Sequence, residues 1–469
     1  MCDRMDWNRL LVEKRFWVPK ADTKEKKDGR SQFEKDIDRI TFSSAFRRLG
    51  RKTQVHLLSK DDHIHTRLSH SLEAACVGRS LGVMVGQWLK DEKERELFRD
   101  IFSPSKVGEI VQAAFLAHDI GNPPFGHVAD KVIRKWFQED MNSNGIDWTG
   151  NLTDSERLDL KYFDGNAMAF RVVTYKEHYK NSGGMRLTYP TLGAMLKYPW
   201  TSHFAESKDK FSCFKTEYSN LCEVAAELRL TEKTRNESES KAKYARHPLA
   251  YLVEAADDIC YRVLDMEDAI GLKLLPQDIF DQQFKEYLTD KLDREQQRLL
   301  KGGSGSWSIK NGLLRGKMIG LMIEEIVRAF KENYDRIMEG SLKSSLLSET
   351  HSNSLCLGIK AFYKKANLKK VIYQNQKNVL LELGAYSALE TLLEASTKAA
   401  SEIYKDKDIS YKTEIIIKFI KEDGEKQFKG KTLHEIIILF LDYVTGMTDN
   451  YATSVNKQLL GLGACPSNN

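Results

Sequence analysis

Proline, paired cysteines and strand-like patterns are scarce in this chain of 469 residues. There are nine prolines, and runs in which Val, Ile or Thr alternate with polar residues are few, so the pattern favours helices over strands. The seven cysteines are scattered, odd in number and never spaced as Cys-x-x-Cys. Their spacing argues against a zinc ribbon or a disulfide scaffold and favours reduced thiols in a cytoplasmic protein.

Long apolar runs and a strong charge imbalance are missing as well. No run approaches the roughly 18 apolar residues that a membrane span needs, and residues 1–7 lack the apolar core of a signal peptide. We therefore expect a soluble cytoplasmic protein without a membrane partner. The net charge of +5 is modest for this length and does not by itself indicate a nucleic-acid-binding protein.

Apolar residues, in contrast, are abundant enough to form a large core. They make up 41% of the chain, and charged residues make up 30%, as in a globular protein. The length exceeds a single typical core, which favours one large domain with an appendage, or two domains. We predict an all-α protein in three parts: an N-terminal segment at 1–32 with a mobile loop at 20–30, a helical core at 33–285, and an additional C-terminal helical region at 286–469.

The most informative stretch is Ala117–His127, which reads AHDIGNPPFGH. Apolar residues at helical spacing precede it, and Gly121 with the two prolines ends that helix. His118 and Asp119 then lie on its last turn, where an imidazole nitrogen and a carboxylate oxygen face one point, as a divalent cation requires. Taken alone, such a pair is more often a helix-end histidine beside a capping or solvated aspartate.

A helix from about His65 to Lys90 is apolar on nearly every side and should be central. Arg67 and His70 share one of its faces because they are three residues apart. A lone histidine on such a helix is usually a satisfied core residue. An arginine is an awkward neighbour in a dry core, however, so a polar cavity suits both residues better.

Two later helices carry carboxylates on the flank of an apolar stripe. His127 and Asp130 share a face, and a carboxylate one turn away can orient an imidazole and raise its pKa, as a general acid needs; an ordinary surface ion pair is the simpler interpretation. On a helix that starts at Pro248, Asp257 lies beside the buried stripe together with Tyr261. We expect Asp257 to be at least half buried, which favours pairing with a metal or another cation.

Three further stretches have a plain interpretation and a sharper one. The basic cluster at 47–52 is more often a solvated face than a phosphate-binding mouth. Lys197 and Tyr198 could place an ammonium and a phenol on a phosphate chain, or simply end a helix before Pro199. The run Thr231–Lys243 has no apolar period and is predicted to be a mobile excursion.

The order of one His, a distant His-Asp pair and a more distant Asp, each on its own helical segment, resembles the HD superfamily of metal-dependent phosphohydrolases. The string HDIGNPPFGH narrows the resemblance to the bacterial dGTP triphosphohydrolases, or dGTPases. The matching segments lie within 46–55, 66–73, 118–127, 164–167, 196–199, 246–261 and 446–452. The stretch from 270 to about 440 does not align and is the expected place for base recognition and oligomer contacts.

The resemblance implies that 33–285 is an HD-type helical core holding one divalent ion. The implied ligands are His70, His118, Asp119 and Asp257. Such a mixed nitrogen and oxygen set suits Mn²⁺ or Mg²⁺, the expected ions, and also Fe, Co or Ni.

The resemblance also assigns the remaining site residues. His127 and Asp130 would form the acid/base pair, although some relatives have Glu at the second position. Six residues would contact the substrate: Gln54 at the sugar 3′-hydroxyl, Tyr261 against the deoxyribose where a 2′-hydroxyl would clash, Asp265 at the sugar edge, and Arg67, Lys197 and Tyr198 on the triphosphate.

The implied activity is hydrolysis of dGTP, with other dNTPs as further candidates, to the deoxynucleoside and inorganic triphosphate. Water would attack the α-phosphorus while His127 protonates the departing 5′ oxygen. A broader dNTP triphosphohydrolase, another HD nucleotide phosphohydrolase and, less favoured, a nucleic-acid-binding regulator with a vestigial site are the alternatives. The family further implies a homohexamer, and a basic patch could dock single-stranded DNA as a regulator.

Overall fold

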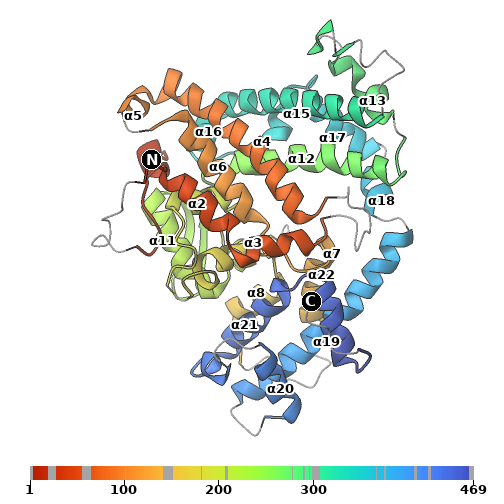
Figure 1. The fold of residues 1–469 in the computed structure, drawn as a ribbon. Coiled ribbons are helices and arrows are strands. Elements are labelled where there is room, and N and C mark those ends of the chain that lie inside the picture. Colours follow the sequence, from red (N-terminus) through yellow and green to blue (C-terminus); the bar gives the residue numbers. More distant parts are fainter. Residues whose placement is uncertain are drawn as a thin grey trace.

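The computed structural model describes the chain apart from residues 1–3, 19–27, 55–64, 101, 141–150, 181, 206–209, 277, 289–290, 295, 298–306, 366, 374–375, 406–408, 421–423 and 464–469. Most of the predicted loop at 20–30 therefore lies outside the described residues. Within them the chain is built of helices with a single two-stranded sheet, which confirms the all-α prediction (Figure 1).

The helices and strands of the first part of the chain are α1 (Trp7–Leu10), α2 (Gln32–Thr41), α3 (Ser44–Arg48), α4 (Arg67–Trp88), α5 (Arg95–Asp100), α6 (Pro104–His118), α7 (His127–Lys135), α8 (Asp154–Lys161), α9 (Gly165–Arg171), α10 (Tyr189–Met195), α11 (Tyr218–Leu228), β1 (Glu232–Asn236), β2 (Lys241–Tyr244) and α12 (Ala250–Gly271). Those of the second part are α13 (Ile279–Leu288), α15 (Trp307–Glu332), α16 (Tyr334–Met338), α17 (Leu355–Lys365), α18 (Leu368–Tyr373), α19 (Gln376–Tyr404), α20 (Tyr411–Ile420), α21 (Leu433–Gly446) and α22 (Asp449–Leu459). Short 3₁₀ or π turns lie at η2 (Leu49–Arg51), η3 (Leu89–Lys93), η4 (Trp136–Asp140), η5 (Val172–Lys176), η6 (Ser202–Phe204), η7 (Lys215–Glu217), η9 (Leu346–Glu349) and η10 (Gly424–Phe428).

Helices α4, α6 and α12 form the centre of the main core, as expected for α4 (Figure 1). Two glycines bring α4 and α6 into backbone contact, because a Cβ added at Gly82 would lie 2.7 Å from the Cα of Gly108. Thr66 caps the start of α4 by accepting a hydrogen bond from the amide of Ser69. The close crossing positions the first turn of α4 beside the last turn of α6.

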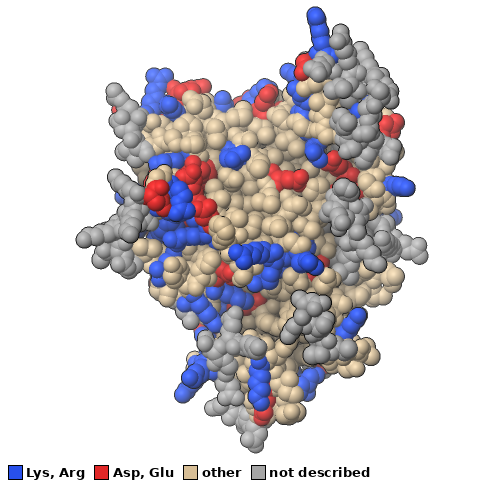
Figure 2. All heavy atoms as spheres, in the orientation of Figure 1, with Lys and Arg blue, Asp and Glu red and all other residues tan. Residues whose placement is uncertain are grey.

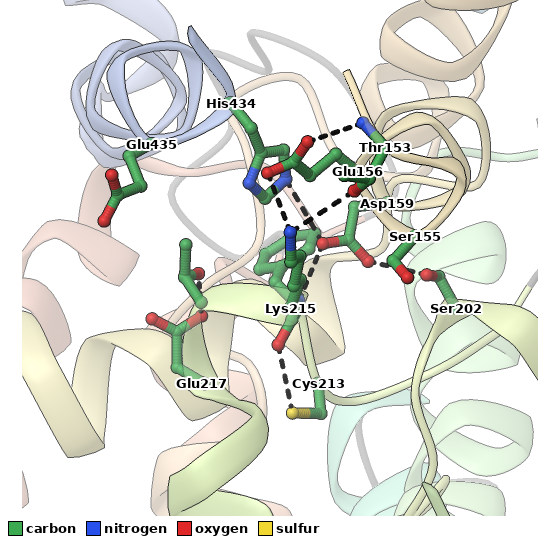
Figure 3. Close-up of polar contacts among 12 residues, drawn as sticks. Thr153, Ser155, Glu156, Asp159, Ser202, Cys213, Lys215, Glu217, His434 and Glu435 are labelled. Atoms are coloured by element: carbon green, nitrogen blue, oxygen red, sulfur yellow. Dashed lines mark hydrogen bonds and ion pairs between the residues drawn. The ribbon is translucent and has the colours of Figure 1, made fainter. Parts of the chain in front are cut away.

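The C-terminal helices α19, α20, α21 and α22 form a lobe that packs on α7 and α8 (Figure 1). A buried polar network joins α21 to α8 (Figure 3). The Asp159 carboxylate accepts hydrogen bonds from the Ser202 hydroxyl (2.6 Å) and the Lys215 amide (2.7 Å), and His434 Nε2 lies 3.2 Å from it. A second buried connection is the bidentate pair of Arg171 with Asp442, with both N···O distances at 2.9 Å.

The segment predicted to be a mobile excursion is instead a β-hairpin. Strands β1 and β2 pair antiparallel, with Asn236 opposite Lys241. The prediction was wrong because β1 is almost entirely exposed and so carries no apolar pattern. The hairpin is held by β2, whose Tyr244 is buried and donates its amide to the carbonyl of Pro199.

Two predicted helix boundaries shift slightly. The helix expected from His65 to Lys90 spans Arg67–Trp88, and the one expected from Pro248 starts at Ala250. Among the described helices, none combines the length and the apolar character needed to cross a lipid bilayer.

Candidate active site

Three helices bring the predicted ligand residues to one place. His70 lies on the first turn of α4, His118 ends α6 and Asp119 follows it directly. One ligand atom from each of these residues lies within 4.8 Å of the other two. On α12, Asp257 completes the group, since its Oδ1 is 3.2 Å from His70 Nε2. The side chain of Asp257 is 33% exposed, which confirms the expected half-burial.

The orientation of His118 leaves one ring nitrogen for a cation. Its Nδ1 lies 2.6 Å from the carbonyl oxygen of Phe115. A carbonyl can only accept, so Nδ1 carries a proton and Nε2 is the ring nitrogen that faces the cluster. That Nε2 lies 3.3 Å from Asp119 Oδ1, so the two donor atoms face the same point.

Asp119 is held by two further side chains. Arg67 Nη1 donates to its Oδ2 at 2.8 Å, and Asn122 Nδ2 donates to its Oδ1. Burial opposes ionisation of Asp119, but the charges of His118, Arg67 and His70 outweigh it and lower its pKa to about 2. A fixed, ionised carboxylate is what a hard or borderline divalent cation needs.

The other two members are coupled in the same way. Burial works against the charge on Asp257, but the hydrogen bond with His70 and the charges of His118 and Lys197 hold the pKa of that carboxyl well below its usual range. Burial lowers and Asp257 raises the pKa of His70, and the net direction is upward. The carboxylates of Asp119 and Asp257 are therefore held in their ionised form by the positive groups around them.

The predicted acid/base pair is described only in part. The side chain of His127 lies outside the described residues, and its backbone begins α7. Asp130 lies one turn later with a mostly buried carboxylate, whose Oδ2 is 3.7 Å from Lys210 Nζ. Its Oδ1 has no hydrogen-bond partner among the described residues, which leaves an acceptor on the face of α7 that His127 shares.

Lys210 is a candidate site residue that the sequence did not indicate. Besides Asp130, its Nζ lies 3.5 Å from Oδ1 of the fully buried Asp164. Burial lowers the pKa of Lys210, but Asp164 and Asp130 outweigh it and raise it. No helical or strand spacing relates Lys210 to Asp130, so the only signal was the matching segment at 164–167.

Two cations and a phenol lie close together near Glu254. Lys197 Nζ is 3.6 Å from Glu254 Oε1 and 5.9 Å from the centre of the Tyr198 ring. Burial lowers the pKa of Lys197, but Tyr198, Glu254 and Asp257 together raise it, so the amine stays protonated. Arg246, which was not predicted as a site residue, lies 5.9 Å from the same ring.

The basic cluster at 47–52 divides in two. Arg47 and Arg51 are exposed, and Figure 2 shows a band of basic side chains across this face of the molecule at the height of α3. Lys52 is buried instead, and its Nζ donates to the carbonyls of Asn122 and Thr445, both at 2.6 Å. The solvated-face interpretation is therefore wrong for Lys52.

The residues predicted to bind the sugar lie in two separate parts of the chain. Gln54 is buried, and its Oε1 has no hydrogen-bond partner in the described part of the chain. Tyr261 and Asp265 are one turn apart on α12. The Tyr261 ring centre is 6.3 Å from that of Tyr363 on α17, a contact from the stretch that the sequence could not align.

No protein-family model matches the chain, but full-length relatives share a name. A deoxyguanosinetriphosphate triphosphohydrolase-like protein of Pseudomonas aeruginosa is 41% identical over 463 residues, which cover 97% of this chain and 99% of that protein. A Synechocystis protein of the same name is 32% identical over 471 residues, covering 98% of this chain and 100% of that protein. A deoxyguanosinetriphosphate triphosphohydrolase of Yersinia enterocolitica is 28% identical over 518 residues, covering 96% of this chain and 98% of that protein.

The alignments cover nearly the whole chain, so the similarity includes both the candidate metal-binding residues and the C-terminal lobe. It agrees with the resemblance carried by the HDIGNPPFGH string. The chain therefore belongs to the deoxyguanosinetriphosphate triphosphohydrolase family.

Proposed function

We propose that this chain is a metal-dependent hydrolase that converts dGTP, and other dNTPs less efficiently, into the deoxynucleoside and inorganic triphosphate. One observation carries the proposal: two histidines and two ionised carboxylates from three helices converge within a chain of this family. The names of the relatives support the substrate class, and the convergence of these side chains supports this cluster as the position of the reaction.

The donor set fits a divalent cation. His70, His118, Asp119 and Asp257 would hold it, and their two nitrogens and two carboxylates suit Mn²⁺ or Mg²⁺ as well as Fe, Co or Ni. When bound, such an ion polarises a phosphoryl oxygen and lowers the pKa of a water molecule. The ring orientation of His118 and the depressed pKa of Asp119 both suit a cation held between them.

The cations around this point suit a triphosphate. Lys197 and Lys210 both keep their protons, because neighbouring residues, carboxylates among them, offset their burial. The Tyr198 phenol lies beside Lys197. Arg67 has a second role, because it also holds Asp119 in place. These four groups would bind the phosphate oxygens and align the α-phosphorus for in-line attack.

Proton transfer and sugar selection are assigned to the remaining residues. His127 would donate a proton to the departing 5′ oxygen, with Asp130 orienting its ring from one turn away. Gln54 would hold the 3′-hydroxyl, since its buried carbonyl needs a donor. Tyr261 would pack on the deoxyribose and Asp265 would contact its edge.

A product analysis tests the proposal. The four dNTPs and GTP are each incubated with the purified protein and either Mn²⁺ or Mg²⁺, and the products are separated by ion-exchange chromatography. We expect deoxyguanosine and intact tripolyphosphate in equal amounts from dGTP. Release of pyrophosphate with a nucleoside monophosphate would instead indicate another class of HD phosphohydrolase.

Variants link the activity to the cluster. His118→Ala and Asp119→Ala should lose hydrolysis and bound metal together, because one ligand removed from a set of four weakens the site severely. His351→Ala is the matched control, since this histidine is exposed and pairs with Glu332 on α15. Full metal occupancy in both ligand variants, measured by inductively coupled plasma mass spectrometry, would refute the assignment.

A further inference from the structure

We propose that Asp449, on the first turn of α22, is a positioning residue. It fixes the Thr53–Gln54 segment and the Phe125–Gly126 turn before α7 relative to each other. The idea rests on the proposed function for Gln54 and His127. The Asp449 side chain forms hydrogen bonds with Thr53 and Phe125, neither of which is a candidate metal ligand. Asp449 would therefore act through these two segments.

The Asp449 carboxylate is only 3% exposed and makes three hydrogen bonds. Its Oδ1 accepts from the amide of Phe125 at 2.8 Å. Its Oδ2 accepts from the amide of Thr53 at 3.0 Å and from the Thr53 hydroxyl at 2.6 Å. Three hydrogen bonds from one buried side chain therefore tie two distant segments to the C-terminal lobe.

The first segment is a strained turn that leads into α7. Phe125 has φ of +69° and Gly126 has φ of +67°. A phenylalanine in the left-handed region is strained and persists only where its surroundings impose that conformation. Here the amide is held by Asp449, and the ring is buried in an apolar cluster with Val444 and Met447 of the C-terminal lobe. This turn sets where His127 begins the helix.

The second segment is held from both sides. Thr53, directly before Gln54, forms a β-bridge with Thr66 at the start of α4. Its other hydrogen bonds go to Asp449. Gln54 is therefore fixed between the helix that carries His70 and the lobe that carries Asp449.

Lys52 makes a second connection among the same three segments. Its Nζ donates to the carbonyl of Asn122, which lies three residues after Asp119, and to the carbonyl of Thr445 at the end of α21. Residues 445–449 therefore contact the Lys52–Gln54 segment twice, through the Thr445 carbonyl and the Asp449 carboxylate, and Lys52 in turn binds the carbonyl of Asn122. An attachment of the lobe does not require these segments, because the Asp442 side chain attaches it through hydrogen bonds to Arg171 alone.

The test compares Asp449→Asn with Asp442→Asn. Asparagine keeps the shape of aspartate but replaces one acceptor oxygen by an NH₂ group, which cannot accept from Thr53 or Phe125. Asp442→Asn weakens a buried attachment of the same lobe without touching either segment. Thr53→Val, which removes only the hydroxyl donor, is a milder second variant in case Asp449→Asn folds poorly.

The readout is the ratio of kcat/KM for dGTP to that for 2′,3′-dideoxy-GTP, with metal content measured alongside. For Asp449→Asn we expect kcat/KM for dGTP to fall on the order of a hundredfold, because small misplacements of reacting groups have effects of that size. The ratio should narrow by roughly tenfold, since the contact of Gln54 with the 3′-hydroxyl weakens. Metal content should stay unchanged, and Asp442→Asn should keep the wild-type ratio.

Hydrogen–deuterium exchange separates this proposal from the proposed function. In Asp449→Asn, peptides that contain Thr53 and Phe125 should lose protection while peptides of α4 and α12 keep it. If wild-type protein released no triphosphate, the proposed function would fail. The exchange result would still decide whether Asp449 holds the two segments in place. Unchanged protection at both segments, or an unchanged substrate ratio in a folded and active variant, would overturn the positioning role.

Discussion

Arg67 donates a hydrogen bond from Nη1 to Oδ2 of Asp119 across 2.8 Å. The guanidinium is buried, and its Nε makes no hydrogen bond to any described residue. An arginine predicted to bind the triphosphate thus already binds a candidate metal ligand. Since a guanidinium carries five N–H donors in a planar fork, one edge can hold Asp119 while another faces an anion. The two roles make separate predictions.

We expect Arg67→Ala to weaken both metal and nucleotide binding. Loss of a group that orients a ligand typically lowers metal affinity about 10- to 100-fold, and loss of a phosphate contact should raise the KM for dGTP. Arg67→Lys keeps the charge but not the fork, so it should recover the KM better than the metal affinity. Equilibrium dialysis with Mn²⁺ and steady-state kinetics measure the two effects. Wild-type metal affinity in Arg67→Ala would show that Asp119 needs no support.

His127→Ala should retain its metal and lose most of its turnover. A proton donor to the leaving group contributes roughly a hundred- to ten-thousandfold to the rate, whereas the four candidate ligands do not include this residue. Metal analysis and kcat are measured on the same preparation, with His203→Ala, a half-buried histidine beside Ser155, as the control. Should metal content and kcat fall in parallel, His127 would be a ligand rather than an acid.

Lys52 should make stability depend on pH above neutrality. Burial, together with the charges of Arg48 and Arg67, lowers the pKa of its ammonium from 10.5 to about 7 in the folded protein. Between these two values the unfolded chain binds more protons than the folded one, so the free energy of unfolding rises with pH. The stability that the folded protein gains from a deprotonated Lys52 is complete above pH 10.5 and is lost as the pH falls through about 7.

Denaturant unfolding from pH 7 to pH 9 measures this dependence. The stability difference between wild type and Lys52→Met should change by up to about 1.4 kcal/mol per pH unit. Lys412→Met replaces an exposed lysine and should give a curve parallel to wild type. A parallel curve for Lys52→Met would mean that Lys52 keeps an ordinary pKa in the folded state.

Much of the candidate site could be predicted because helical spacing is a local property. The three-residue separation of Arg67 and His70 and the position of His118 at a helix end both follow from the sequence pattern. That Asp257 meets them from α12 came from the family resemblance, since no local rule relates residues so far apart. The structure places all four candidate ligand residues together.

Other features depend on tertiary packing and left no local pattern. Lys210 and Asp449 matter because of the distant groups they contact, Asp130 and Phe125. The hairpin of β1 and β2 escaped notice because its first strand is exposed on both faces. Lys52 lies in a run of basic residues that favours a solvated face, yet two backbone carbonyls bind it in the interior. Charge patterns alone cannot reveal such partners.

Tyr261 should decide between deoxyribonucleotides and ribonucleotides. Its ring lies on α12 one turn after Asp257, and Tyr363 lies behind it at 6.3 Å between ring centres. A ring packed on C2′ leaves no room for a hydroxyl, and an unpaired buried polar group costs roughly 1 to 3 kcal/mol. In Tyr261→Ala we expect lower dGTP turnover and a narrower ratio of kcat/KM for dGTP to that for GTP, because the lost packing affects both substrates while the lost clash favours only GTP. Tyr363→Phe keeps the supporting ring and removes only its hydroxyl, which donates to the backbone carbonyls of Arg262 at 2.9 Å and of Tyr261 at 3.4 Å, so it separates the effect of these hydrogen bonds from that of the Tyr261 ring. An unchanged ratio in Tyr261→Ala would place sugar selection at Gln54 or Asp265 instead.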